Sequence, residues 1–466
     1  MLLGAIASAV EMHRELARLV GAEHVLEGAA ASAYNEDQSH RRGLVGRADA
    51  VVLPGSADEV AAVLGWCYAH DVALVARGGG TGLLGGAVPT EGGVVCSLER
   101  LRSVRELEPG LWEMHVDAGV STRHVQRLAR ENGLLFAPDP GAAEQSQIGG
   151  NVATNAGGPH ALKYGVTGSW VTGLEAALAP GELVALGGRA RKDVAGYDLK
   201  SLLVGSEGTL GVITGVRLRL LPAPAAARSL VAFFQTRAQG CAAILEVLGA
   251  GIQASALDFL DATTLELVGG GYPGAPGTLP KGAGFALLVE VDGTAAEVAA
   301  QCEALVELLA PAALAVEEPR DAAALWRWRD GFNGVVRAGR GGKVSEDVAF
   351  PVEKLREGLE RFEALAAERG LRSCAWGHGG EANVHATVLV DPASEAELDA
   401  ADAAGEELFA LVTSLGGSIA AEHGVGWLKR GRLAAHWDAR AVALHEEIKR
   451  AFDPKGLLNP GKKLAR

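Results

Sequence analysis

The sequence predicts an α+β protein with more than one domain, and three observations support this class. The chain has 466 residues, of which 48% are hydrophobic and 21% charged, enough for two or three domains with full hydrophobic cores. Near its start, two short apolar runs flank a helical segment, as in a β-α-β unit. In the segment 223–425, helical segments alternate with short strands.

The first half of the chain contains alternating strand and helix signals. The expected strands are 50–53, 72–76, 93–98 and 111–117, and the expected helices are 57–70 and a segment from about Thr122 to Asn132-Gly133. Ser56 and Glu59 have the spacing of a capping box at the start of the first of these helices. The opening MLLGAIASAV lacks a basic start and leads into the helical EMHRELARLVG, so we expect a cytoplasmic amino-terminal helix rather than a signal peptide.

The second half has a different composition. After LRLLPAPAAA the chain becomes richer in Ala, Leu and Glu, which predicts a domain boundary near Pro222. The expected elements are strands at 230–235, 285–291 and 384–390, an irregular loop at 269–282 and a final helix around 438–452.

Charge and cysteine usage exclude several classes of protein. The formal net charge of −14 makes a nucleic-acid partner unexpected, whereas a local Arg or Lys cluster still allows an anionic small molecule. No run of about 18 apolar residues occurs, so no membrane span is expected. The five cysteines are scattered singly without a C-x-x-C pair, which argues against an iron–sulfur cluster, a zinc knuckle or a disulfide scaffold.

The run ARGGGTGLLGGAVP (76–89) contains a formal G-x-G-x-x-G pattern. A nicotinamide-binding Rossmann fold needs a strand before this pattern and a helix after it. A strand does precede it, and Glu99 lies where the ribose-binding acid is expected, but AVPTEGG breaks a helix and VVCSL is a strand. Successive small residues instead leave backbone N–H groups able to converge on a phosphate. A glycine-rich surface loop is the alternative for this segment alone.

Two further glycine-rich runs follow in the same half of the chain, PDPGAAEQSQIGGNVATNAGGPHALKYGVT (138–167) and RKDVAGYDLKSLLVGSEGTLGVIT (191–214). Thr154 and Asn155 add polar side chains for phosphate or ring edges. Three such runs in one domain are hard to explain by turns alone, and together they are able to wrap a long dinucleotide.

These segments, above all IGGNVATNAGG, DVAGYDL and GSEGTLGVIT, resemble the FAD-binding domain of the vanillyl-alcohol oxidase/p-cresol methylhydroxylase fold. Within this fold they resemble the FAD-linked D-2-hydroxyacid branch, which includes D-lactate dehydrogenase, the glycolate oxidase FAD subunit and D-2-hydroxyglutarate dehydrogenase. The resemblance runs from about residue 35 to the end of the chain.

The resemblance implies a two-lobed FAD-binding domain of the p-cresol methylhydroxylase type at 1–222. A substrate (cap) domain of α+β type, built on an antiparallel sheet, is expected at 223–425, and a segment that returns to the FAD domain at 426–466. Covalently flavinylated relatives carry a His near the position of Thr81, so the FAD here is expected to be non-covalent. The residues expected to contact it are Arg77, Gly78, Gly79, Gly80, Thr81, Gly82, Gly85, Gly86, Pro140, Gly141, Ile148, Gly149, Asn151, Ala153, Thr154, Asn155, Gly157, Glu207, Gly208, Gly211, Ile213 and Asn459.

The second half also holds two segments rich in metal-ligand residue types. WGHGGEANVH (376–385) contains His378 and His385, and GGSIAAEHGVG (416–426) contains Glu422 and His423. Two imidazoles and a carboxylate suit Zn²⁺ or Mn²⁺, but the wide spacing of the histidines does not match short-range zinc motifs, so spacing alone favours a structural role. The resemblance implies that the first two His and the Glu are ligands and that His423 is the base. Glu381-Ala382 replaces the family's Asp-Gly pair in this turn, and Ala takes a positive φ less easily than Gly.

The segment 325–351 supplies cations for a substrate carboxylate. Most of Arg327, Arg337 and Arg340 are expected to be surface cations. A guanidinium is a natural bidentate clamp for a carboxylate, and the resemblance assigns this role to Arg329, with Lys343 in support. The family's hydroxyl-bearing residue one turn later aligns with Asn333, which predicts a different preference for the substrate tail.

The implied reaction is FAD-dependent oxidation of a D-2-hydroxy acid of the lactate, glycolate or 2-hydroxyglutarate class to the 2-oxo acid, with metal-assisted deprotonation of the hydroxyl. The sequence does not choose among a protein, a quinone and O₂ as the electron acceptor. It is also compatible with a homodimer and with a peripheral position on the membrane. The alternatives are a flavin-binding subunit of a glycolate oxidase-like complex and a flavin oxidase of the same fold with another substrate, such as a sugar lactone. A further alternative within the same fold is a non-redox enzyme that transfers an alkyl group.

Overall fold

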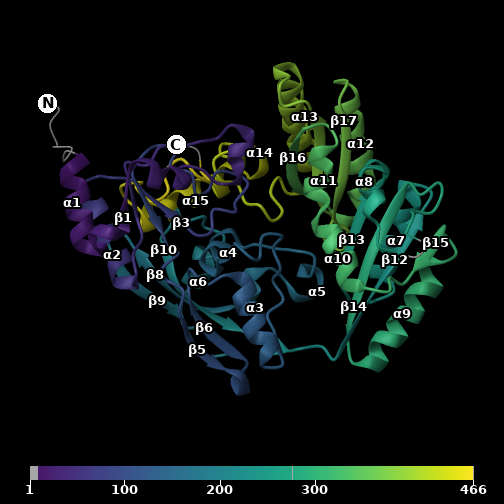
Figure 1. Cartoon of the computed structure of the whole chain (residues 1–466), viewed down its shortest axis with the longest axis horizontal. Helices are drawn as coiled ribbons and strands as arrows, with labels where there is room; N and C mark the ends of the chain where they lie inside the picture. Colours follow the sequence, from purple (N-terminus) through teal and green to yellow (C-terminus); the bar gives the residue numbers. More distant parts are fainter. Residues whose placement is uncertain (1–8, 275–276, 465–466) are drawn as a thin grey trace. The chain divides into compact units, whose positions relative to one another are not determined.

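The computed structural model describes residues 9–274 and 277–464, and the chain divides into two compact units (Figure 1). Unit 1 contains the chain up to Gly157, from Gly165 to Ala223 and from Glu422 onward. Unit 2 contains Pro224–Ala421 together with the short segment Gly158–Tyr164. Unit 1 therefore contains the three glycine-rich runs except for seven residues, and unit 2 contains the first histidine segment and the arginine segment.

Unit 1 is built on two main sheets. The first has the order β1-β2-β4-β3, in which β2, β4 and β3 run parallel and β1 antiparallel. Its strands are β1 (Val25–Leu26), β2 (Ala50–Val52), β3 (Leu74–Arg77) and β4 (Val94–Ser97). The second is antiparallel, with the order β5-β6-β10-β8-β9. Its strands are β5 (Val104–Glu108), β6 (Glu113–Asp117), β8 (Val171–Leu178), β9 (Glu182–Gly187) and β10 (Val212–Arg219).

Helices and a small strand pair complete unit 1. The helices are α1 (Ala9–Val20), α2 (Ala57–Ala69), α3 (Thr122–Glu131), α4 (Ile148–Thr154), α6 (Leu199–Leu203), α14 (Leu433–His436) and α15 (Ala439–Phe452). The pair is β7 (Leu134–Leu135) with β11 (Leu221–Pro222). Short 3-10 helices are η1 (Ala22–His24), η2 (Gly28–Tyr34), η3 (Gln38–Arg42), η4 (Pro109–Leu111) and η5 (Thr167–Trp170).

Two local features of unit 1 follow from its sequence. The Ser56 side chain accepts the Glu59 N–H and caps α2 as predicted. A capping box also requires the Glu59 carboxylate to accept the N–H of Ser56. It accepts the N–H of Gly55 instead, so this second hydrogen bond was predicted wrongly by one residue. Near the end of the chain, Leu74 donates its N–H to Leu457 and accepts the N–H of Asn459, which lays the carboxy-terminal segment beside β3.

Unit 2 is built on one seven-stranded sheet with the order β15-β12-β14-β13-β17-β18-β16, in which every pairing is antiparallel. This confirms the expected α+β unit with an antiparallel sheet. The strands are β12 (Ala226–Phe234), β13 (Ala254–Asp261), β14 (Phe285–Gly293), β15 (Ala315–Glu317), β16 (Gly342–Ala349), β17 (Arg372–His378) and β18 (Asn383–Val390).

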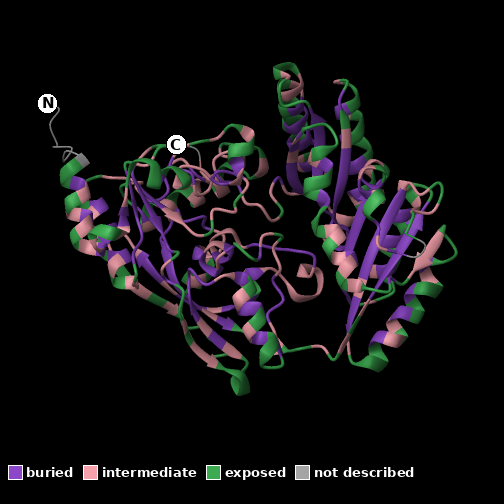
Figure 2. Ribbon diagram, in the orientation of Figure 1, coloured by how far each residue is buried: buried purple, intermediate pink, exposed green. Residues whose placement is uncertain are grey.

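The strands of this sheet are largely buried (Figure 2). Helices cover both of its faces, and the alternation of residues along each strand separates two cores. In β12, Leu230 and Ala232 belong to one core, whereas Val231 and Phe233 belong to the other. The first core is covered by α7 (Arg237–Gly249), α9 (Ala295–Leu309), α12 (Leu355–Ala367) and α13 (Glu395–Ser414). The second is covered by α8 (Ala262–Val268), α10 (Ala322–Asp330) and α11 (Phe332–Ala338). The remaining short helices are α5 (Ala161–Tyr164), η6 (Gly269–Gly271), η7 (Val352–Lys354) and η8 (Gly379–Glu381).

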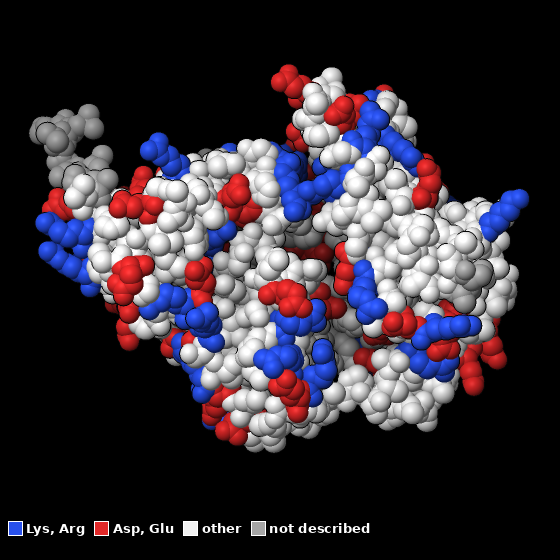
Figure 3. All heavy atoms as spheres, viewed as in Figure 1, with Lys and Arg blue, Asp and Glu red and all other residues white. Residues whose placement is uncertain are grey.

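Three further observations concern the described residues as a whole. All five cysteines are buried and free. None of the described helices has the length and apolar composition needed to cross a bilayer. Figure 3 shows acidic and basic side chains interspersed over the face of each unit that it presents. Residues 1–8 of the predicted amino-terminal helix, and 275–276 of the predicted loop 269–282, lie outside the described residues.

Candidate active site

The first glycine-rich run leaves β3 and packs tightly against the second. A Cβ on Gly79 would lie 2.1 Å from the carbonyl oxygen of Gln145, so only glycine fits. At Gly80, where φ is +65°, a Cβ would lie 2.2 Å from Arg77 Nη2. A Cβ on Gly86, in contrast, would meet no atom within 4 Å. The start of the run is therefore fixed against protein, whereas Gly86 faces open space.

The Arg77 side chain is engaged by the chain itself. Its Nη1 donates to the carbonyl oxygen of Glu36 at 2.7 Å, its Nη2 donates to that of Ala33 at 3.3 Å, and the guanidinium lies over the ring of Tyr34. Arg77 therefore anchors the first run to the segment 33–36. Glu99, which matched the ribose-binding position of a Rossmann fold, instead accepts the Tyr34 hydroxyl at 3.0 Å.

The second run contains helix α4, whose first turn packs against Ala118, the residue that follows β6. A Cβ on Gly149 would lie 2.6 Å from the Cβ of Ala118, and the Gly149 N–H donates to the Ala118 carbonyl oxygen. Thr154 donates its hydroxyl to the Gly150 carbonyl oxygen at 3.0 Å, and Asn155 Oδ1 accepts the Gly168 N–H at 2.8 Å. These side-chain groups, expected to contact phosphate or ring edges, stabilise the run itself.

The carboxy-terminal segment forms hydrogen bonds to both the first and the third glycine-rich run. Asn459 Nδ2 donates to the carbonyl oxygens of Gly86 at 2.8 Å and Glu207 at 2.7 Å. The Glu207 carboxylate accepts the N–H groups of Val425 at 3.0 Å and Gly426 at 2.6 Å. Glu207, expected as a flavin contact through its loop, thus uses its carboxylate to hold the segment that follows His423 along the chain.

The polar atoms of these runs fit a dinucleotide. Three buried groups, Gln147 Oε1, Ser206 Oγ and Asn459 Oδ1, have no hydrogen-bond partner among the described residues. Buried polar groups of this kind are normally satisfied, so they call for a polar ligand. The open space at Gly86 and at Gly141 is consistent with the same ligand.

The other expected FAD contacts lie in the same unit. Gly82 accepts the Gln38 N–H, and Gly85 packs its backbone against Leu44. The remaining residues of the set, all in unit 1, are Gly78, Thr81, Pro140, Ile148, Asn151, Ala153, Gly157, Gly208, Gly211 and Ile213.

In unit 2, one buried carboxylate holds both an expected metal ligand and the expected substrate clamp. Asp258 in β13 lies directly opposite His378 in β17. Its Oδ1 is 2.7 Å from His378 Nδ1, and its Oδ2 accepts Arg329 Nε–H at 2.6 Å. Burial alone would raise the pKa of the Asp258 carboxyl, but the charge of Arg329 and the hydrogen bonds from His378 and Arg329 outweigh it and lower that pKa to about 2. Asp258 is therefore an ionised acceptor.

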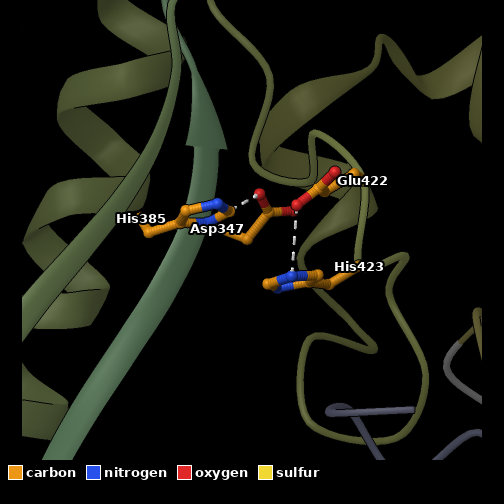
Figure 4. A group of neighbouring side chains, drawn as sticks. All are labelled: Asp347, His385, Glu422 and His423. Carbon is orange, nitrogen blue, oxygen red and sulfur yellow. Dashed lines mark ion pairs between the residues drawn. The ribbon is translucent and has the colours of Figure 1, made fainter. Parts of the chain in front are cut away.

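A second buried acid, Asp347 in β16, lies beside His385 in β18 (Figure 4). Its Oδ1 is 3.8 Å from His385 Nδ1 and accepts Asn383 Nδ2–H at 2.8 Å. Its Oδ2 accepts the N–H of Ala421 at 3.0 Å. Ala421 belongs to the segment 416–426 and directly precedes Glu422, so this bond holds the backbone of that segment at Ala421.

In unit 1, Glu422 and His423 form their own pair, with Glu422 Oε1 3.5 Å from His423 Nε2 (Figure 4). The Glu422 carboxylate also lies close to the second glycine run, since a Cβ on Gly157 would be 3.1 Å from its Oε2. Asp347 and His385 in unit 2, and Glu422 and His423 in unit 1, have donor types that bind a divalent cation. His378 lies next to His385 in unit 2, with ring centroids 5.7 Å apart.

The turn that joins the two imidazole-bearing strands contains a left-handed residue although its sequence has alanine there, which takes a positive φ less easily than glycine. Ala382, where the family has glycine, adopts φ +49° and is fully buried. Its methyl group belongs to the core under α7 and α12, and this burial offsets the strain of the left-handed conformation.

The cations of the arginine segment differ in how far they are exposed. Arg327 and Arg340 are at the surface, paired with Asp321 and Glu397. Lys343 lies in β16 with its Nζ 4.7 Å from the centre of the Trp376 ring. The Arg329 side chain is only 10% exposed, which separates it from the others.

Comparison with known proteins assigns the family. A family model described as "FAD linked oxidases, C-terminal domain" matches residues 223–463, and a model described as "FAD binding domain" matches residues 48–187. The chain belongs to the FAD-linked oxidases. This FAD-linked oxidase is 35% identical over 422 residues to the glycolate oxidase subunit GlcD of Bacillus subtilis, covering 90% of this chain and 89% of the relative. It is 36% identical over 414 residues to the D-lactate dehydrogenase of Archaeoglobus fulgidus, covering 88% and 90% of the two chains.

Among solved structures, p-cresol methylhydroxylase with substrate bound has a TM-score of 0.82 at 17% identity, covering 98% of this FAD-linked oxidase and 97% of that chain. The likeness confirms the predicted fold class. The family models and the relatives confirm that the FAD-linked oxidase is a flavin-dependent oxidoreductase.

Two residues of the candidate site were missed by the sequence analysis, Asp258 and Asp347. Asp347 lies in the more polar SEDVAF and gave no local signal, whereas Asp258 is a carboxylate in the middle of the largely apolar strand segment ALDFL. A charged side chain at such a position is normally paired, so this pattern was the available signal.

Proposed function

We propose that this FAD-linked oxidase oxidises a D-2-hydroxy acid of the lactate, glycolate or 2-hydroxyglutarate class to the 2-oxo acid. The main support is the site in unit 2, where a buried guanidinium and two imidazoles are held by buried acids. The relatives named glycolate oxidase subunit and D-lactate dehydrogenase support the same substrate class. Non-covalent FAD, when bound, accepts a hydride from C2 of the substrate.

Arg329 binds the substrate carboxylate in this proposal. A guanidinium has five N–H donors, so a bond from Nε to Asp258 is compatible with a second carboxylate on the same side chain. Lys343, held over the Trp376 ring, adds positive charge for the same anion. His423 takes the hydroxyl proton as the general base, so the loss of a proton and a hydride gives the 2-oxo acid.

A divalent cation, Zn²⁺ or Mn²⁺, is proposed to lower the pKa of the substrate hydroxyl by Lewis acidity. Its proposed ligands are His378, His385 and Glu422, and Asp347 is added to them because it lies beside His385 and holds Ala421. The donor types suit either cation.

The test is reduction of an artificial acceptor dye by the isolated, FAD-loaded chain with a panel of D- and L-2-hydroxy acids. We expect turnover with at least one D acid and none with its L enantiomer. Removal of metal by a chelator, checked by metal analysis, is expected to lower turnover, and added Zn²⁺ or Mn²⁺ to restore it. Unchanged turnover in a demonstrably metal-free sample would contradict the metal proposal alone.

A second candidate is a flavin-binding subunit that works only within a complex. It is favoured by the name of the Bacillus subtilis relative, which is described as a subunit. Steady dye reduction by the isolated chain would exclude it, whereas flavin that binds without any turnover until a partner protein is added would support it.

A further inference from the structure

We propose that Asp258 is a positioning residue that fixes the proposed metal ligand His378 and the proposed substrate clamp Arg329 at the same time. This inference rests on the proposed function, because it assumes that these two residues bind a cation and a carboxylate. Asp258 itself is assigned no contact with the substrate or cofactor.

The geometry gives each oxygen of Asp258 one partner. Oδ1 pairs with His378 Nδ1 at 2.7 Å and Oδ2 with Arg329 Nε at 2.6 Å. The side chains of Asp258 and His378 are 3% and 4% exposed, so solvent does not compete for these bonds. Bonds of this type to an ionised group are about twice as strong as neutral ones.

The fold makes this arrangement rigid. Asp258 and His378 are directly opposed residues of the paired strands β13 and β17. Leu257 and Phe259 point into the core under α7, and Leu260 into the core under α10, so alternation places Asp258 on the α10 face. Arg329 lies in the last turn of α10 and reaches Asp258 from that side.

The bond to Asp258 also selects the tautomer of His378. An ionised carboxylate only accepts hydrogen bonds, so Nδ1 carries the proton and Nε2 keeps the lone pair that a cation needs. Asparagine at position 258 replaces one of these two oxygens by an NH₂ group, so it presents a donor instead of an acceptor to one of the two partners. An amide N–H directed at His378 would favour the opposite tautomer, in which Nε2 carries the proton.

The experiment compares three FAD-loaded proteins: wild type, Asp258→Asn and Asp261→Asn. Asp261 is the matched control, because it is a buried acid of the same strand but bonds to the N–H groups of Thr264 and Ala375. Binding of Mn²⁺ is measured from the electron paramagnetic resonance signal of the free ion, and KM and kcat are measured with the D acid turned over fastest. We expect Asp258→Asn to weaken Mn²⁺ binding by about 10- to 100-fold and to raise KM, with FAD content unchanged, and Asp261→Asn to bind Mn²⁺ as wild type does.

The outcomes separate this inference from the proposed function. If His378→Ala weakens Mn²⁺ binding and Asp258→Asn does not, Asp258 is only structural and the proposed metal site stands. If wild type binds no Mn²⁺, or His378→Ala binds it normally, the proposed ligand set is wrong and this inference falls with it.

A second variant covers the case in which Asp258→Asn does not fold. Asp258→Glu keeps the negative charge beside Arg329 but displaces the two oxygens by one methylene group. We expect it to fold, to retain FAD and to weaken Mn²⁺ binding by about 10-fold. Wild-type affinity in this folded variant would overturn the inference.

Discussion

Replacing Gly86 by alanine is expected to have opposite effects on the stability of the FAD-free protein and on FAD affinity. A Cβ on Gly86 meets nothing within 4 Å, and its φ lies outside the left-handed region. Alanine at such a position stabilises a protein by about 0.4 to 1 kcal/mol, because it reduces the freedom of the unfolded chain. The variant without FAD should therefore unfold at a slightly higher urea concentration than wild type.

The same methyl group should interfere with bound FAD. The space around Gly86 is open in the protein itself, so any loss of affinity must arise from contact with the ligand. An extra methyl group in a well-packed interface costs about 1 to 3 kcal/mol, which corresponds to an increase of about 5- to 150-fold in the dissociation constant of FAD.

Titration of the FAD-free proteins with FAD, followed by flavin fluorescence, measures the affinity, and urea unfolding measures the stability. Gly110→Ala is the matched control, since a Cβ there also meets nothing within 4 Å but the residue lies in η4, outside the three runs. It should leave FAD affinity unchanged. Gly79→Ala, with its Cβ 2.1 Å from a backbone oxygen, should destabilise even the FAD-free protein. Normal FAD affinity in Gly86→Ala would refute the assignment of this loop to the cofactor.

Three further predictions concern unit 2 and the base. His423→Ala should lower kcat by about 100- to 10,000-fold while FAD stays bound, because it removes the proton acceptor; normal turnover excludes this role. Arg329→Lys should raise KM for the hydroxy acid by about 10- to 100-fold, since an ammonium group lacks the planar fork of a guanidinium. Arg327→Lys, at an exposed position, should leave KM unchanged. Equal KM values in the two variants would contradict the role of Arg329 in binding the substrate carboxylate. Burial raises the pKa of the Asp261 carboxyl to about 6. The folded state therefore binds this proton more tightly than the unfolded state does. Its contribution to the free energy of unfolding is up to about 3 kcal/mol; it is fully present below about pH 4 and is lost as the pH rises through about 6. Urea unfolding of wild type and Asp261→Asn across this range should show that the variant lacks this loss; parallel curves would contradict it.

Local sequence signals predicted much of the fold. The Ser56 cap, the apolar strands and the glycine that ends α3 depend on neighbouring residues, so they could be placed closely from sequence. Helix α4 was not expected inside a glycine-rich run, because Gly149 and Gly150 are poor helix formers. It forms because Ile148 and Val152 are buried and Gly149 packs on Ala118, and these tertiary contacts override propensity.

The candidate site shows the same limit more clearly. Its histidines and Glu422 were found because they are metal-ligand residue types in two short segments that resemble the family. Asp258 was not found because its partners lie 71 and 120 positions away and only strand pairing brings them together. Asp347 was missed for the same reason, since its bond to Ala421 spans 74 positions. Arg329 was expected to serve the substrate alone, and its bond to Asp258 depends on the placement of α10 on the sheet.

The most direct test of the proposed oxidation is a single turnover without oxygen. Purified, FAD-loaded protein is mixed with D-lactate, glycolate or D-2-hydroxyglutarate, and the visible absorbance of the flavin is followed in time. We expect at least one of these acids to bleach the flavin in the absence of any partner protein, and deuterium at C2 to slow the bleaching. A flavin that stays oxidised with every acid, although FAD is bound and the protein is folded, would contradict the proposed function.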